Sequence, residues 1–165
     1  PLSRRQRQMC IRDSISIETE NLTIAENTKI SASTSDSGNG GEIKINSSET
    51  FQLQGRILTE STGTGDGGII NIEAGEITAP NSTISAKSTG AGNAGTIDIT
   101  AQGDITTGVV TSAAKNKRET ADGGRISITS EQGKINATRA IQSFSEGGNA
   151  GDVTLKAKTL SLIHI

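Results

Sequence analysis

The fold is decided by a segment that reads GNGGEIKI at residues 38–45 and recurs as GDGGIINI at 65–72, GNAGTIDI at 92–99, ADGGRISI at 121–128 and GNAGDVTL at 148–155. The last glycine of each turn lies at Gly41, Gly68, Gly95, Gly124 and Gly151. The steps between these glycines are 27, 27, 29 and 27 residues. A nearly fixed period of this length indicates an architecture in which each repeat stacks on its neighbours.

Each glycine-rich turn leads into a strand with one apolar face. The aliphatic residues come in the pairs Ile43 and Ile45, Ile70 and Ile72, Ile97 and Ile99, Ile126 and Ile128, and Val153 and Leu155. Successive strand residues point to opposite faces. The intervening residues Lys44, Asn71, Asp98, Ser127 and Thr154 therefore point the other way.

Two further apolar patches follow within each repeat. The second patch contains Leu22 and Ile24, Phe51 and Leu53, Ile77, Ile105 and Ile135. The third patch contains Ile30, Ile57, Ile84, Val110 and Ile141. Three short strands and three turns per repeat describe one coil of a three-sided solenoid.

We therefore predict an all-β fold, a right-handed parallel β-helix over residues 14–159 with about five coils of about 27 residues. Ile43, Ile70, Ile97 and Ile126 should form one interior stack, with Ile45, Ile72, Ile99 and Ile128 forming a second. A repeat of strands and helices is the main alternative. It is disfavoured because no segment spaces its apolar residues at a period of 3.6, and glycine, serine and threonine interrupt the chain throughout.

The two ends of the chain differ from the repeats. Residues 4–14 read RRQRQMCIRDS and residues 160–165 read LSLIHI, and both strings resemble a translated transposase-type sequencing adapter, read from opposite strands. The repeat register calls for glycine at position 13, where Asp13 stands. We therefore expect residues 1–13 and 160–165 to be non-native, and residues 1–13 to contribute nothing to fold or function. At the other end Leu160 and Leu162 match Leu22 and Ile24 of the repeat, so the position of that junction is open by a few residues.

The composition of residues 14–159 excludes several kinds of chemistry. Without Arg4, Arg5, Arg7 and Arg12 the Lys+Arg count falls from 16 to 12, and without Asp13 the Asp+Glu count falls from 18 to 17, so the net charge changes from −2 to −5. The region contains no Cys, His, Met, Trp or Tyr. It therefore offers no thiol nucleophile, imidazole base, Cys/His zinc site or disulfide. An acidic chain without aromatic platforms is also poorly suited to nucleic acid, and no apolar run is long enough to span a membrane.

One turn position carries a side-chain amide or carboxylate in every repeat, and its residues are Asn39, Asp66, Asn93, Asp122 and Asn149. Asn and Asp bond readily to nearby backbone, and we expect the flanking glycines to supply positive φ. Stacked coils should place the five residues in a structural ladder. Calcium is the alternative ligand, but one aspartate per coil supplies too few oxygens for it.

The most extended turn, at residues 113–124, carries Lys115, Lys117 and Arg118. These cations form a candidate surface-binding loop for an anionic polysaccharide, because insertions on one side of a solenoid are often functional. A short solvated loop is the alternative interpretation. The neighbouring carboxylates Glu18 and Glu20, and Glu73 and Glu76, do not interrupt the repeat and are interpreted as solvated surface.

The coil openings GNGGxIxI and GNAGxIxI and the strand ends of the form I-S-A-x-S-T-G resemble the filamentous-haemagglutinin-like exoproteins of two-partner secretion, in their cyanobacterial form. The resemblance covers nearly all of residues 14–159 and implies the β-helical shaft of a large protein that is secreted or attached to the bacterial cell surface. It implies a structural stalk and adhesion surface, without catalytic residues or cofactors. The outer-membrane transporter of such a system would recognise a secretion domain that this sequence does not contain.

Three other functions remain open. The chain could be formed by the non-catalytic coils of a β-helical polysaccharide-active enzyme, or it could be a polysaccharide-binding solenoid. It could also be an ice-binding solenoid, which would need an outward Thr-x-Thr array in every coil. The third strands ILTES, ISAKS, VVTSA and IQSFS contain no such array. We therefore expect a non-enzymatic protein whose partners are a cell surface or a polysaccharide.

Overall fold

The computed structural model describes residues 14–35, 37–117 and 120–162. The strands are β1 (Ser14–Ile24), β2 (Lys29–Ser31), β3 (Glu42–Leu53), β4 (Arg56–Leu58), β5 (Ile69–Ser85), β6 (Thr96–Ala101), β7 (Ile105–Ala114), β8 (Arg125–Ser130), β9 (Lys134–Ala137), β10 (Ile141–Ser145), β11 (Val153–Lys156) and β12 (Thr159–Leu162). These described segments contain no α-helix, and so none that could cross a membrane.

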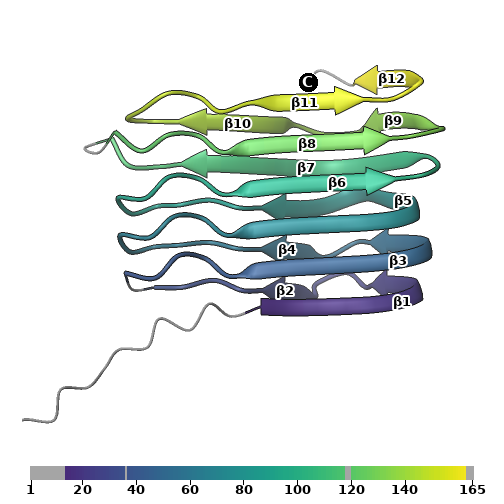
Figure 1. The fold of residues 1–165 in the computed structure, drawn as a ribbon, viewed down its shortest axis with the longest axis horizontal. Helices are drawn as coiled ribbons and strands as arrows, with labels where there is room; N and C mark the ends of the chain where they lie inside the picture. The colour runs from purple at the N-terminus through teal and green to yellow at the C-terminus, as the bar shows by residue number, and fades with distance from the viewer. Residues whose placement is uncertain (1–13, 36, 118–119, 163–165) are drawn as a thin grey trace, which may run out of the picture.

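The strands wind into a β-solenoid of about five coils of about 27 residues, as the repeat period predicts. Every strand pairing among the described residues is parallel and joins one coil to the next. The coils rise in a right-handed sense from β1 to β12 (Figure 1). The predicted fold class is therefore confirmed.

Each coil has three faces, and each face is a stack of parallel strands. The first face follows the order β1, β3, β5, β6, β8 and β11. The second face is formed by the later part of β1, β3 and β5, the start of β7, and then β9 and β12. The third face is formed by β2, β4, the end of β5, the end of β7 and β10.

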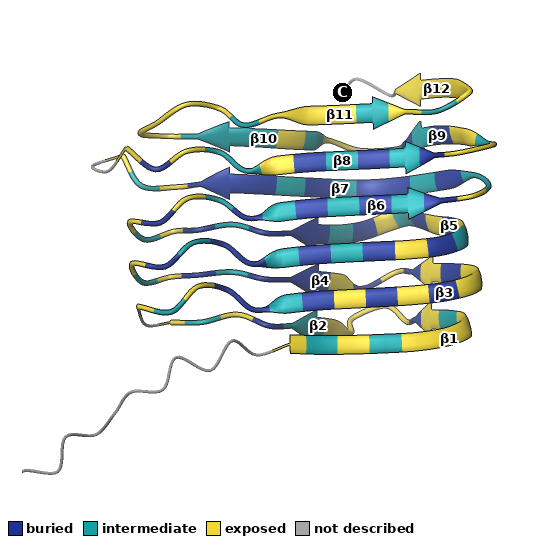
Figure 2. Ribbon diagram, in the orientation of Figure 1, coloured by how far each residue is buried: buried dark blue, intermediate teal, exposed yellow. Residues whose placement is uncertain are grey.

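The aliphatic residues form continuous columns inside the coils, and both predicted stacks are confirmed. Ile43 pairs with Ile70, Ile70 with Ile97, and Ile97 with Ile126, and each of these side chains is fully buried. The second and third patches form equivalent columns, in which Phe51 and Ile84 are also buried. Burial is complete in the middle coils and decreases toward both ends (Figure 2).

At some corners one strand continues from one face to the next, whereas the sequence predicts three separate strands per coil. β3 turns from the first face to the second, and β5 covers parts of all three faces. The pairing register shifts at these corners, for example between Ser47 and Thr50. One strand can continue around a corner because its backbone still bonds to the coil above or below, as Gln102 N–H does to the Ala74 carbonyl.

Of the two terminal segments, the structure describes only part of the second. Residues 1–13, expected to be non-native, lie outside the described residues. At the other end, residues 159–162 form β12 and pair with β9, with Leu160 beside Ile135 and Leu162 beside Ala137. The segment 160–162 therefore continues the second face of the solenoid.

Candidate functional site

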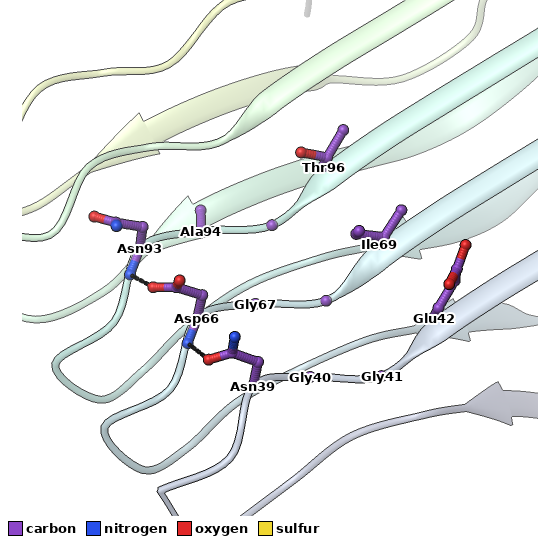
Figure 3. A pocket seen from close by; sticks show the side chains of 12 residues that line it. Asn39, Gly40, Gly41, Glu42, Asp66, Gly67, Ile69, Asn93, Ala94 and Thr96 are labelled. Atoms are coloured by element: carbon purple, nitrogen blue, oxygen red, sulfur yellow. Dashed lines mark hydrogen bonds between the residues drawn. The ribbon is translucent and has the colours of Figure 1, made fainter. Parts of the chain in front are cut away.

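The structure places the five Asn and Asp residues of the turn in one column and bonds each to the next. A side-chain Oδ1 in one coil accepts a hydrogen bond from the backbone N–H of the equivalent residue in the following coil. The bonds run from Asp66 to Asn39 at 2.9 Å, and from Asn93 to Asp66, Asp122 to Asn93 and Asn149 to Asp122 at 2.8 Å. Figure 3 shows the first two steps of this Asn/Asp ladder.

A second hydrogen bond completes each step of the ladder. The backbone N–H of the residue after the ladder position donates to the ladder residue's carbonyl in the next coil. Gly40 donates to Asp66 and Gly67 donates to Asn93, both at 2.8 Å. Ala94 donates to Asp122 at 2.9 Å. Each step thus satisfies two backbone N–H groups that a glycine-rich turn would otherwise leave to water.

The glycines of the turn serve a purpose that the sequence interpretation missed. We expected them to supply positive φ, but this was wrong, since no described glycine has positive φ. Among the other described residues only Asn27 does, at 60°. Their role is close approach between coils. A Cβ on Gly95 would lie 2.0 Å from the Gly68 carbonyl oxygen, and a Cβ on Gly124 would lie 1.9 Å from that of Gly95.

Buried serines hold the glycine-rich turn against the third face, and sequence reasoning also missed them. Ser88 donates to the Gly65 carbonyl at 3.3 Å, and Ser61 donates to that of Gly38 at 3.4 Å. Ser112 donates to the Gly95 carbonyl at 2.6 Å. Ser61 and Ser88 recur 27 residues apart, four residues after the aliphatic residue of the third strand, so the signal was present in the sequence.

A shallow groove runs beside the ladder across three successive coils (Figure 3). Its lining is Asn39, Gly40, Gly41, Glu42, Asp66, Gly67, Gly68, Ile69, Asn93, Ala94, Gly95 and Thr96. The glycines of the lining are buried and their N–H groups are bonded within the solenoid, so each coil offers a ligand its ladder side chain, at a regular interval. The groove can therefore form repeated hydrogen bonds to an extended polar ligand.

The acidic side chains that line the groove do not form a cluster that could hold a metal ion. Its two carboxylates, Glu42 and Asp66, come from different coils, and Asp66 is already bonded to the Asn93 N–H. Within residues 14–35, 37–117 and 120–162, no three His, Cys, Asp or Glu side chains lie close enough together to hold a metal ion.

The candidate surface-binding loop is only partly described. Lys115 and Lys117 are exposed, whereas Arg118 lies outside the described residues. The Lys115 Nζ lies 5.7 Å from the centroid of the Phe144 ring in the next coil, and its backbone N–H donates to the Ser88 carbonyl. A cation over an exposed aromatic ring is stabilised by about 0.5–1 kcal/mol. Lys115 is therefore positioned by its coil, with its charge facing solvent.

Two ion pairs link neighbouring coils on the outer surface. Lys87 lies 2.8 Å from Glu60 on the third face, and Lys134 lies 3.4 Å from Asp104 on the second. The Lys134 backbone N–H also donates to Asp104, and this bond, followed by the ammonium group, lowers the pKa of the Asp104 carboxyl below its ordinary value. Both pairs therefore join one coil to the next.

No protein-family model, no curated protein and no solved structure matches this chain. The function is therefore inferred from the repeat pattern, the solenoid and its surfaces.

Proposed function

We propose that this chain is part of the β-helical shaft of a large secreted or surface-attached exoprotein, and that it acts as a structural stalk and adhesion surface. The observation that carries the proposal is the uniformity of the contacts between coils. The same aliphatic columns and the same Asn/Asp ladder join each coil to the next. A stack in which each coil makes the same contacts with the next can extend in length without changing its cross-section, and a stalk needs this property.

The outer surface has the variability that an adhesion surface needs. One outward column of the first face contains Lys44, Asn71, Asp98, Ser127 and Thr154 in successive coils. Inward positions on the same strands remain aliphatic. The charge and hydrogen-bonding groups of the surface can thus change from coil to coil without disturbing the interior, because alternate strand residues face opposite sides.

Two surfaces are proposed to contact the ligand, a polysaccharide or another cell-surface polymer. The groove beside the Asn/Asp ladder offers hydrogen-bonding groups in three successive coils. The exposed Lys115 and Lys117 would attract anionic groups of the polymer. In this proposal, the full-length protein reaches the surface through an outer-membrane two-partner secretion transporter and catalyses no reaction.

The test measures retention of the chain on immobilised anionic polysaccharides, together with release of soluble products. We expect retention without turnover, and weaker retention of a Lys115→Glu/Lys117→Glu variant. An Arg56→Glu/Arg139→Glu variant is the matched control, because it makes the same change in net charge at two exposed residues that belong to neither proposed surface. Hydrolase or lyase products would overturn the stalk proposal, and equal retention of the two variants would overturn the role of the loop.

A further inference from the structure

The Asn/Asp ladder contains three dipeptides in which a side chain can react with the backbone that follows it. They are Asn39–Gly40, Asp66–Gly67 and Asp122–Gly123. In such a pair the glycine nitrogen can attack the side-chain carbonyl carbon of the preceding residue and close a cyclic imide. Glycine favours this attack because it has no side chain to hinder it and adopts a wide range of backbone conformations. Each pair is therefore a potential site of covalent modification.

The stacking of the coils requires glycine as the second residue of each pair. A Cβ on Gly40 would lie 2.5 Å from the nearest backbone nitrogen of the next coil, and this distance is 2.6 Å for Gly67 and for Gly123. A contact this short with backbone cannot be relieved by rotation of a side chain. The first residue of each pair supplies the Oδ1 of the ladder. The turn thus combines the two features that make imide formation fast.

The same stacking holds both reacting groups of the pair Asn39–Gly40. The Gly40 nitrogen must lose its proton and turn toward the Asn39 Cγ, but its N–H donates to the Asp66 carbonyl at 2.8 Å. The Asn39 side chain must rotate toward this nitrogen, but its Oδ1 accepts from the Asp66 N–H at 2.9 Å (Figure 3). The ring can therefore close only after the coil that carries Asp66 has moved away.

The other two pairs are held in the same way. For Asp66–Gly67 both hydrogen bonds are formed with Asn93, whose carbonyl accepts from the glycine N–H and whose N–H donates to the Oδ1, each at 2.8 Å. For Asp122–Gly123 both are formed with Asn149, again at 2.8 Å. One residue of the next coil thus holds each pair, so the reactivity of the pair depends on the contact between those two coils.

We propose that Asn39–Gly40, Asp66–Gly67 and Asp122–Gly123 are modification sites, which the stacked coils keep unreactive and which local separation of two coils makes reactive. At Asn39 the glycine nitrogen forms a bond to Cγ, the bond from Cγ to Nδ2 breaks, and ammonia leaves with the amide proton. At the two aspartates the same attack on the protonated carboxyl group releases water. Water then opens the imide at either carbonyl and gives aspartate or isoaspartate, without oxidation or reduction.

Restacking of the coils cannot reverse this modification. The imide has no N–H at residue 40, so the hydrogen bond to the Asp66 carbonyl is lost. Isoaspartate carries the main chain through its side-chain carbons and lengthens it, which moves the ladder oxygen away from its partner in the next coil. Aspartate at position 39 would place a carboxylate one rung from Asp66, about 4.8 Å away. Each product therefore weakens the contact that had protected the pair, whether or not the solenoid binds a ligand.

Peptide mapping of the 165-residue chain, incubated folded and in urea at the same mildly alkaline pH, tests the proposal. The mass of the tryptic peptide 30–44 reports deamidation of Asn39, and the chromatographic retention of the peptide 57–87 reports isomerisation of Asp66. Loss of two hydrogen bonds of ordinary strength limits the reactive population, so both reactions should be slower in the folded chain on the order of thirtyfold. Asn93 is followed by alanine, whose methyl group hinders the attack, and it should react slowly in both states. Equal rates at Asn39 in the two states would overturn the proposal.

Two glycine variants test whether each pair is protected by its own contact between coils. A Cβ on Gly65 would lie 2.1 Å from the Gly38 carbonyl oxygen and 2.7 Å from the Asn39 nitrogen. A Cβ on Gly92 would lie 2.1 Å from the Gly65 carbonyl oxygen and 2.6 Å from the Asp66 nitrogen. Gly65→Ala should therefore speed deamidation of Asn39 on the order of tenfold, and Gly92→Ala should do the same for isomerisation of Asp66.

Each variant is the matched control for the other, because both place one methyl group against the backbone of the coil below. Equal acceleration of the two reactions in each variant, with its circular dichroism spectrum unchanged, would overturn the protection of individual pairs. The comparison of the folded chain with the chain in urea needs no variant. It therefore decides whether stacking protects Asn39 even where an alanine variant does not fold.

Discussion

The reason for glycine at the end of each turn can be tested at Gly95, in the middle of the stack. A Cβ at this position would lie 2.0 Å from the Gly68 oxygen, 2.8 Å from the Gly67 carbonyl carbon and 2.9 Å from its oxygen. All three atoms belong to backbone, so no side chain can rotate away. An ordinary contact to a Cβ begins at 3.4 Å, and the two coils must therefore separate by about 1.4 Å.

A shift of that size would break the hydrogen bonds on both sides of Gly95. Thr96 donates to the Gly68 carbonyl at 3.0 Å, and Gly95 donates to the Ala86 carbonyl at 2.8 Å. Each buried group left unpaired costs about 1–3 kcal/mol. We therefore expect Gly95→Ala to lower the free energy of unfolding by about 3–5 kcal/mol, which is a large part of the total for a domain of this size.

Gly38→Ala is the matched control, because it lies in the same kind of turn. A Cβ there would lie 3.6 Å from the Thr34 Oγ1, an ordinary contact. Alanine should be neutral, or stabilise by about 0.4–1 kcal/mol through the unfolded chain. Urea unfolding followed by circular dichroism gives both values. A Gly95→Ala variant with a midpoint like that of Gly38→Ala would refute the close-approach argument.

Three further predictions concern single side chains. The Thr59 hydroxyl is buried without a hydrogen-bond partner. Thr59→Val should therefore raise the free energy of unfolding, measured by urea titration, by about 1–2 kcal/mol, and a lower free energy of unfolding would contradict this prediction. Asn93→Ala removes the acceptor for the Asp122 N–H, and it should lower stability by about 0.5–1.5 kcal/mol and speed hydrogen exchange at Asp122. An NMR titration of the Asp104 carboxyl should give a pKa below its ordinary value. The contribution of this carboxyl to stability is therefore present above the pKa of the unfolded chain, and it is lost as the pH falls through the lowered pKa of the folded chain. Lys134→Ala should raise this pKa only partly, because the backbone N–H of residue 134 still donates to the carboxyl.

The interior of the fold could be predicted from the sequence because burial on one face imposes a visible period. Ile70 had to lie beside Ile97, since both follow an equivalent turn and a shift by one residue would expose each of them. The continuation of β5 around its corners could not be predicted in this way. It depends on backbone bonds between coils, which every residue with a backbone N–H can donate and which therefore leave little pattern in the sequence.

The Asn/Asp ladder was visible as a recurring residue type, but its bonding was not. An asparagine in a turn usually bonds to backbone nearby in its own turn, and this was the expectation for Asn39. In the structure its Oδ1 accepts from the Asp66 N–H, 27 residues later. A partner in the next coil becomes identifiable only when the stacking register is known.

The alternation of Asn with Asp follows from what the ladder requires of each side chain. Every step uses one Oδ1 as an acceptor, and both residue types provide that oxygen equally well. A ladder of aspartates alone would place negative charges one rung apart, about 4.8 Å. Replacing every second Asp by Asn doubles that separation and halves the repulsion between nearest charges, while all the hydrogen bonds remain. Each ladder position thus requires a side-chain Oδ1 but can be either neutral or charged. This explains why the neutral Asn93 can separate Asp66 from Asp122.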